Sequence, residues 1–397
     1  RLGEPVPRSL LDDVVAAAPP VADLPEHQGP LLGARLSNLL PGVWSARMPI
    51  KLANRRAEAR LEQWAEPWAA LGATLGLADE RAALGSAWRS LLQNQAHDSI
   101  CGCSVDATHE RMGARFDDAA RLASETTDRV LHRLAGRAAE REVPWSDTAT
   151  VTVFNPSPHP VTDVVRVPLD LEPALALPLG EPQLHPLATA LLSGGLTVDG
   201  RTARLVPSAE PHAQWVPDQR PMDVELVARD VPAFGSRRYT REAGAAGEDE
   251  VAAGRVAATD AVTAEVEAGG TMAVTLGGDR WTGLFGIEDV GDRGDSYDHD
   301  PVGEPITPAP VEVGVERRRA PNGVQALTVV RRFELPARLD DDRDSRTAET
   351  VDTTLALTCR LVPGVDRVDT RVTVEDPARD HRMRLLFPTG GPVDRFE

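Results

Sequence analysis

The sequence predicts a multidomain α+β protein in which a three-helix bundle is followed by an antiparallel β-sandwich region. Between residues 51 and 142, apolar side chains recur every three or four positions, which is the period of one helix face. After Val143 and Pro144 the pattern changes to alternating apolar and polar residues, punctuated by Pro and Gly, which is typical of strands. At 397 residues, the chain is long enough for two or three domains, each with its own core.

Three segments carry the helical pattern. In the first, from about residue 51 to 72, Leu61, Trp64 and Trp68 lie three or four positions apart. The second segment follows Asp79 and the third follows Asp106, and an aspartate at either position can cap a helix N-terminus. We interpret Trp64, Trp68 and Trp88 as core residues rather than as platforms for a sugar. The side chains expected to be buried between the second and third helices are Leu84, Trp88, Leu92, Met112 and Phe116.

A histidine–aspartate pair stands where the second and third helical segments join. The stretch LLQNQAHDSICGCSV places His97 and Asp98 at the end of the second helix. Gly102 follows in the connection, where a positive φ costs a glycine little. A helix-end cap that faces water is one interpretation of this pair, and a functional site at the mouth of the helical hairpin is the other.

The strand-like runs begin near residue 149 and continue almost to the end of the chain. Runs such as TDVVRVPL, VQALTVVRRFEL and VDRVDTRVTVE alternate with period two, and two packed antiparallel sheets would bury their apolar faces. Between them, the stretch 286–301 (GIEDVGDRGDSYDHDP) gathers five aspartates around Tyr297. The ligand spacing of a calcium-binding loop is missing, so an acidic turn is the alternative to a binding loop.

The composition excludes several classes of partner. With 61 acidic and 43 basic residues, the formal net charge is −18, which argues against nucleic acid and against an anionic membrane surface. The sequence contains no run of about 18 apolar residues, which is the length that a membrane-spanning helix needs. Cys101, Cys103 and Cys359 are too few for a disulfide framework, so we expect a reducing, cytoplasmic location. A homo-oligomer remains an open alternative.

Four stretches resemble the family 38 glycoside hydrolases, the zinc-dependent α-mannosidases. The block NQAHDSICGCSVDATHERM is similar to the Gln-x-His-Asp-x-x-x-Gly block of that family's helical segment. Residues 41–47 (PGVWSAR) are similar to the Pro-Gly-x-x-Ser-x-Arg run that leads from the family's catalytic α/β domain into its helices. The 286–301 loop resembles the Gly-Asp-x-Tyr-x-x-x-Pro loop of bacterial members, and residues 378–390 (ARDHRMRLLFPTG) resemble its Asp-His-Arg-x-Arg-x-x-Phe-Pro strand.

The resemblance implies a domain organisation. Residues 1–50 would be the tail of the catalytic α/β domain and its connection, residues 51–142 the three-helix middle domain, and residues 143–397 a truncated all-β C-terminal mannosidase domain. We therefore expect the chain to be an internal fragment of a longer protein, with the α/β domain upstream.

The resemblance also implies a reaction, the retaining, zinc-dependent hydrolysis of α-mannosidic bonds in a mannose-containing oligosaccharide or mannoside. By position, His97 would be a zinc ligand, while Asp98 and Tyr297 would contact the sugar. The family's His-x-Asp ligand pair and its nucleophilic aspartate lie upstream of the helices, and this chain contains no His-x-Asp. We therefore assign no nucleophile within the chain and expect the fragment alone to be inactive.

Two alternatives remain. One is a mannosylglycerate or phosphomannoside hydrolase of the same family. The other is a non-catalytic carbohydrate-binding or structural module, against which the aromatic content of 4% argues, because sugar-binding platforms rely on exposed Trp and Tyr.

Overall fold

The computed structural model describes residues 9–23, 40–77, 79–136, 149–168, 195–207, 222–295 and 297–391. The chain divides into two compact units, Arg1–Leu39 with Thr389–Glu397, and Leu40–Pro388. In the first unit the described helices are short, α1 (Leu11–Ala17) and η1 (Val21–Asp23). The predicted boundary between residues 142 and 143 lies outside the described residues, and the α/β origin of residues 1–50 stays a prediction.

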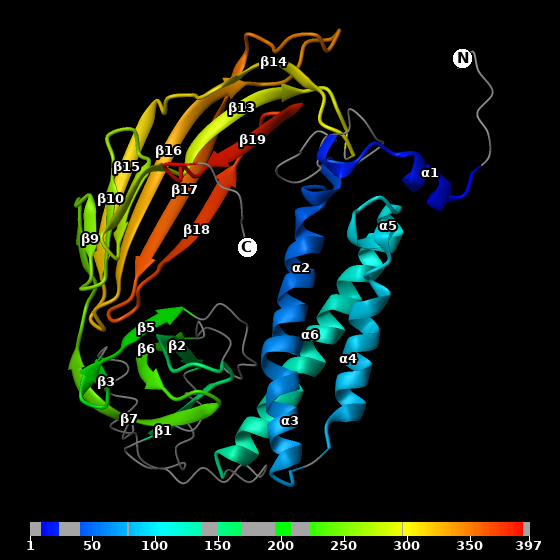
Figure 1. The fold of residues 1–397 in the computed structure, drawn as a ribbon. Helices are drawn as coiled ribbons and strands as arrows, with labels where there is room; N and C mark the ends of the chain where they lie inside the picture. Colours follow the sequence, from blue (N-terminus) through cyan, green and yellow to red (C-terminus); the bar gives the residue numbers. More distant parts are fainter. Residues whose placement is uncertain are drawn as a thin grey trace. The chain divides into compact units, whose positions relative to one another are not determined.

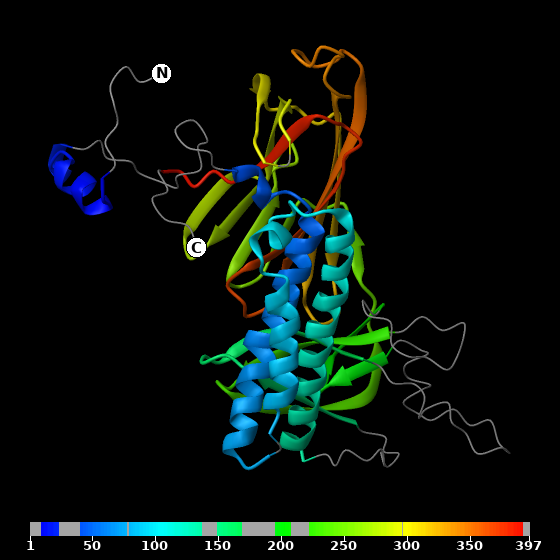
Figure 2. The ribbon, with the colours of Figure 1, turned by 90° about the vertical axis from the view of Figure 1, so that its right-hand side faces the viewer.

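Three long helical segments run side by side in the second unit (Figures 1 and 2). They are preceded by the 3-10 turn η2 (Pro41–Trp44), and the second and third are joined through a short helix, α5 (His97–Ile100). The first segment is continuous over α2 (Met48–Glu58), η3 (Ala59–Ala65) and α3 (Glu66–Thr74); the second is α4 (Arg81–Gln93) and the third is α6 (Asp106–Leu134).

The first helical segment contains a π-helical stretch, η3, directly before Pro67. A proline inside a helix has no N–H to donate, and its ring collides with the carbonyl group four residues earlier. Widening the preceding turn to π geometry makes room for the ring without ending the helix. The sequence pattern predicted a regular helix here because the apolar spacing alone does not reveal the proline's effect.

The core between the helices confirms part of the predicted list and corrects the rest. Leu84, Met112 and Phe116 are buried, as predicted. The prediction that Leu92 is buried is wrong. This residue is 60% exposed, because the neighbouring Leu91 faces the core instead. Adjacent helix residues point about 100° apart, so only one of the two leucines can face the core.

The three tryptophans differ in burial. Trp68 is buried and packs edge-on against Phe154, with ring centroids 5.4 Å apart. Trp64 was predicted to be core and is exposed. Trp88 is half-buried, and its indole N–H donates to Glu66 Oε1 at 2.6 Å.

Neither predicted capping aspartate occupies the N-cap position itself. Asp79 lies one residue before the N-cap of α4, from where its Oδ1 accepts the backbone N–H of Arg81 at 3.0 Å. Asp106 is the first residue of α6, and its carboxylate pairs with Arg47 at 2.7 Å. Both carboxylates therefore lie at a helix N-terminus, where negative charge is favourable.

The first group of strands forms two small antiparallel sheets that pack on each other. Their shared core is made of Val151 and Val153 from one sheet and Val224, Leu226 and Ala228 from the other, among others. The sheet orders are β1 (Ala149–Asn155), β7 (Gly235–Ala246), β3 (Gly195–Val198), β4 (Arg201–Thr202) in one, and β2 (Val161–Pro168), β6 (Met222–Val231), β5 (Arg204–Pro207) in the other.

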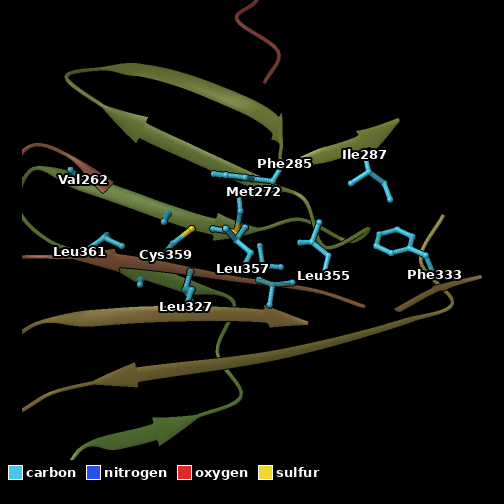
Figure 3. Close-up of a cluster of buried hydrophobic side chains, with 14 of the residues drawn as sticks. Val262, Met272, Phe285, Ile287, Leu327, Phe333, Leu355, Leu357, Cys359 and Leu361 are labelled. Carbon is cyan, nitrogen blue, oxygen red and sulfur yellow. The ribbon is translucent and has the colours of Figure 1, made fainter. Parts of the chain in front are cut away.

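The later strands build a larger sandwich around a second core (Figure 3). Its central strands, β16 (Gln325–Pro336) and β17 (Thr350–Leu361), alternate buried and less buried residues, so that Leu327, Leu355 and Leu357 point into the core. Met272 and Phe285 cover them from the facing sheets.

The five-stranded sheet of this sandwich is ordered β18 (Val368–Glu375), β17 (Thr350–Leu361), β16 (Gln325–Pro336), β15 (Glu312–Arg319), β8 (Glu250–Ala252). The facing sheets are β12 (Asp279–Leu284), β11 (Met272–Leu276), β10 (Val262–Val266), β9 (Val256–Ala258), and β14 (Pro301–Ile306), β13 (Gly286–Asp292), β19 (His381–Leu386). Every strand pairing is antiparallel among the described residues. The predicted class, helices followed by packed antiparallel sheets, is confirmed.

None of the helices in the described part of the chain has both the length and the apolar character that a membrane crossing needs.

Candidate substrate-binding site at the end of the helices

The connection between α4 and α6 is a compact turn built on backbone hydrogen bonds. The carbonyl oxygen of Asp98 accepts the N–H groups of both Cys103 and Ser104, each at 3.0 Å. Gly102 lies in the left-handed region with φ of 89°, and a Cβ there would lie 3.3 Å from the side chain of Arg47. A glycine is therefore needed both for the backbone conformation and for the close approach of the arginine.

Two cations from the beginning of α2 hold this turn. Arg47 donates through Nε to the carbonyl oxygen of Gly102 at 3.1 Å and pairs with Asp106 at 2.7 Å. Lys51 donates to the carbonyl oxygen of Cys101 at 3.1 Å. Burial lowers the pKa of Lys51, with the cysteines acting against it. The predicted Pro-Gly-x-x-Ser-x-Arg run thus supports the turn through its arginine.

The two polar residues just before the histidine fix the end of α4. Asn94 is fully buried, and its side-chain amide donates to the carbonyl oxygen of Met112 at 3.0 Å. The Gln95 amide donates to Asn54 Oδ1 at 2.6 Å. Because these bonds reach α6 and α2 respectively, they set the position of the following residues relative to all three helical segments.

His97 and Asp98 themselves point into solvent. Their side chains are 91% and 68% exposed, and His97 Nε2 lies 3.4 Å from Asp98 Oδ1. The turn is held by Arg47 and Lys51, so the exposed imidazole and carboxylate are positioned and available to a ligand.

The acidic loop that carries Tyr297 is ordered by its own aspartates. Asp292 Oδ1 accepts the N–H groups of Gly294 and Asp300 at 2.9 and 3.0 Å. Asp295 Oδ1 accepts the N–H of Tyr297 at 2.7 Å. Burial would raise the pKa of Asp292, but hydrogen bonds from His299 and from the two amides outweigh it and lower the pKa. This loop is a self-supported turn.

Gly294 has no room for a side chain. A Cβ at this position would lie 1.9 Å from the carbonyl oxygen of Asp298. This explains in physical terms why the loop has a glycine directly before the Asp-x-Tyr run.

Tyr297 brings the loop to the end of the helices. Its carbonyl oxygen accepts the N–H of Gly42 at 2.8 Å. A hydrogen bond with the Cys103 thiol raises the pKa of the Tyr297 phenol, and the negative charge of Asp98 acts in the same direction. The two residues predicted to contact a sugar, Asp98 and Tyr297, are therefore linked through Cys103, whose backbone N–H donates to the Asp98 carbonyl oxygen, although they are far apart in the sequence.

Sequence reasoning missed a buried charge cluster in the sandwich that carries the loop. His381 Nδ1 lies 2.5 Å from Asp289 Oδ1, and its Nε2 lies 2.9 Å from Asp376 Oδ2. Arg346 pairs with the second oxygen of Asp289 at 2.5 Å. The signal was present in the Asp-His-Arg stretch, but Asp289 lies on a distant strand, β13, and its contact with His381 cannot be predicted from spacing.

The charge cluster changes the protonation of His381. Burial alone would lower its pKa, but the hydrogen bonds with Asp289 and Asp376 outweigh it and raise the pKa to about 9. His381 is therefore a cation near neutral pH. It joins β19 to β13, and β13 ends at Asp292, which orders the Tyr297 loop.

Within the described residues, no group of three or more His, Cys, Asp or Glu side chains is arranged to hold a metal ion. His97 offers one exposed imidazole, which fits the role of a single ligand in a larger set. The nearby His109 is buried in α6, and burial followed by the charge of Arg47 lowers its pKa.

Both the helical domain and the whole fold are similar to those of known proteins. Residues 38–134 match the family model of the alpha mannosidase middle domain. An alpha-mannosidase from Enterococcus faecalis has a similar structure, with a TM-score of 0.71, 23% identity and coverage of 96% of this chain and 47% of that chain. A glycosyl hydrolase family 38 protein from the same organism gives a TM-score of 0.70, 22% identity, and coverage of 97% and 49%.

One further similarity is local. A stretch of 30 residues is 57% identical to a putative mannosylglycerate hydrolase of Halalkalibacterium halodurans, and it represents 8% of this chain and 3% of that protein. This chain spans about half the length of the two solved structures that it matches.

A helical domain followed by packed antiparallel sheets is therefore a fold that this chain shares with both solved structures. The predicted resemblance to this family is confirmed in the middle domain and in the fold. The chain carries an alpha-mannosidase middle domain and has, over nearly its whole length, the fold of glycoside hydrolase family 38.

Proposed function

We propose that the protein takes part in the zinc-dependent hydrolysis of α-mannosidic bonds with retention at the anomeric carbon. The observation that carries the proposal is that hydrogen bonds through Gly42 and Cys103 bring the Tyr297 loop to the turn that carries Asp98 and the exposed His97. The nucleophile and the remaining metal ligands would come from residues upstream of the helices, and the 397-residue chain would be inactive by itself.

His97 would be one zinc ligand. Its exposed ring can present a lone pair, and the supporting bonds of Asn94 and Gln95 hold the turn in place before any ligand arrives. When bound, zinc would polarise and orient the sugar hydroxyls as a Lewis acid.

Asp98 and Tyr297 would position the sugar. An ionised carboxylate accepts strong hydrogen bonds from hydroxyl groups. Because the pKa of Tyr297 is raised, its phenol stays protonated and can donate a hydrogen bond. A hydroxyl placed between an acceptor and a donor satisfies both, which is how a neutral sugar is held.

We place the activity in the cytoplasm, because all three cysteines are free thiols, as expected in a reducing compartment. A mannoside is the proposed partner. Mannosylglycerate is a second candidate substrate, which the local identity to a putative mannosylglycerate hydrolase favours.

The test uses the complete protein with its upstream region. The variant His97→Ala should lower zinc content and should reduce turnover of an aryl α-mannoside by more than the about 10–100-fold typical of losing an outer-shell partner. Excess zinc should restore part of the activity. The control His132→Ala removes an exposed histidine of the same helical domain and should change neither quantity.

The variant Asp98→Asn should behave differently. Zinc content stays that of wild type, and turnover falls by about 10–100-fold because a charge-assisted hydrogen bond of about 1.5–3 kcal/mol is lost. The matched control is Asp117→Asn, an exposed carboxylate on α6. Wild-type zinc content and turnover in His97→Ala would contradict the metal role. Running the series on both the aryl mannoside and mannosylglycerate decides between the two substrates.

A further inference from the structure

A cavity in the smaller pair of sheets concentrates positive charge in an otherwise acidic protein. Its volume is about 280 Å³, and three arginines line it, Arg201, Arg229 and Arg237. One carboxylate, that of Asp199, lies among the lining residues. With a formal net charge of −18 for the whole chain, this local excess of guanidinium groups is unusual.

The arginines are brought together by three strands. Arg201 begins β4, after a tight turn in which Asp199 and Gly200 both have positive φ, 49° and 69°. Two such residues in sequence make the type I′ turn of a two-residue hairpin. Arg229 lies on β6 and Arg237 on β7. The cavity therefore has a floor in both sheets, with Leu226 and Tyr239 supplying apolar surface.

The guanidinium groups are not neutralised within the described part of the chain. Arg237 donates to the carbonyl oxygen of Arg229 at 2.8 Å and lies over the ring of Tyr239 at 5.7 Å. Arg229 donates weakly to the carbonyl oxygen of Pro363 at 3.4 Å, and its Nε is buried without a hydrogen-bond partner among the described residues. Among these residues, neither arginine makes an ion pair with a carboxylate.

The acidic groups nearby are committed elsewhere or face outward. Asp199 Oδ1 accepts the backbone N–H of Thr240 at 2.8 Å, and this bond holds the hairpin turn. Asp230 is exposed and does not line the cavity. Asn322 completes the lining, with its amide donating to Glu225 Oε1 at 3.3 Å.

We propose that this cavity binds a small anion through a carboxylate or phosphate group. Guanidinium forks bind both groups bidentately, and a buried, unpartnered Nε gains most from such a ligand. At about 280 Å³ the cavity lies just below the range of about 300–1,000 Å³ of typical small-molecule sites. The ligand is therefore small, with its charged group on the arginines and an apolar or ring portion against Leu226 and Tyr239.

This site shares no residue with the one proposed for mannoside hydrolysis, so each can fail without the other. The test titrates the full chain with inorganic phosphate and, separately, with D-glucuronate, by isothermal calorimetry at constant ionic strength. Sodium chloride is the blank. At least one of the two anions should bind saturably with one site per chain. Binding of phosphate alone or of glucuronate alone tells which charged group the site takes.

Two charge-removing variants and one matched control locate the binding. Arg201→Gln and Arg237→Gln should each weaken it about tenfold, because a charge-assisted hydrogen bond is lost. Arg238→Gln removes the same charge from the next residue of β7, which does not line the cavity, and should leave affinity unchanged. Urea unfolding confirms that the variants fold. Absence of saturable binding by both anions, or an equal loss in all three variants, would overturn the proposal.

Discussion

Two histidine–aspartate contacts of the chain, His97 with Asp98 and His381 with Asp289, differ in almost every physical respect. His97 and Asp98 are adjacent in sequence, are 91% and 68% exposed, and lie 3.4 Å apart. His381 and Asp289 come from different strands, are 7% and 0% exposed, and lie 2.5 Å apart. The same two residue types thus form one contact at the surface and another inside a sandwich.

The difference shows how burial assigns a role to a charged pair. Inside the protein, each charge needs its partner, because an uncompensated buried ion is costly. His381 is therefore tied on both ring nitrogens, and Asp289 is tied on both oxygens. At the surface water satisfies both groups, so His97 and Asp98 contribute little to stability and remain available to a ligand.

The largest expected effect follows from removing the buried imidazolium. His381→Ala leaves the buried carboxylate of Asp289 and the partly exposed carboxylate of Asp376 short of a partner and should lower the free energy of unfolding by about 3–5 kcal/mol. Urea denaturation measures it. The control is Arg382→Ala, an exposed residue on the same strand, with an expected change within about 0.5 kcal/mol. Equal losses in the two variants would mean that the strand, and not the charge cluster, is responsible.

A second expectation concerns pH. The pKa of His381 is raised from 6.5 to about 9 in the folded protein, so its stabilising contribution is fully present below pH 6.5 and is lost as pH rises towards 9. The free energy of unfolding should therefore fall across this window. In His381→Gln the fall that this group causes should disappear. A wild-type profile that is flat, or that rises, from pH 6.5 to 9 relative to the variant would contradict the assignment.

The surface pair should give the opposite result in the same assay. His97→Ala and Asp98→Asn should unfold at the wild-type urea concentration, because neither side chain is buried or holds another group. A clear loss of stability in either variant would mean that the pair caps the helix end, which was the alternative interpretation from the sequence.

The smallest effect tests whether Asp98 and Tyr297 are neighbours. The charge of Asp98 contributes to the raised pKa of Tyr297, so Asp98→Asn should move that pKa down towards its usual value. NMR titration of ¹³C-labelled tyrosine follows it, and Tyr239, the second tyrosine of the chain, serves as an internal control whose pKa should not change. An unchanged Tyr297 titration would separate the loop from the helix end.

Features that depend on local periodicity were predicted from the sequence. Predictions failed where tertiary packing decides which of two adjacent residues is buried. The fold class follows from apolar spacing, which the buried Leu84, Met112 and Phe116 confirm. Whether Leu91 or Leu92 faces the core depends on how the helix is rotated about its axis by one residue. The π-helical stretch before Pro67 results from the steric clash of the proline ring with the preceding turn, which the apolar spacing does not show.

Some residues of the candidate site were likewise predicted from the sequence, and others were not. His97, Asp98 and Tyr297 were predicted through a resemblance, and their roles in binding metal and sugar stay predictions. The Asp289–His381 contact could not be predicted, since the two residues meet only when β13 and β19 pair. The arginine-lined cavity likewise needs three strands that the sequence does not bring together.

The hydrogen bond from Gly42 to the carbonyl oxygen of Tyr297 has a consequence for the order of folding. It joins the segment before the first long helix to a loop of the last sandwich, and contacts between such distant residues pay a large loop-closure entropy. The helices contain mostly local contacts and can form early. We therefore expect α6 amides to gain protection from hydrogen exchange during refolding before the amide of Gly42 does. Protection of Gly42 at the same time as α6 would show that helices and sandwich fold as one cooperative unit.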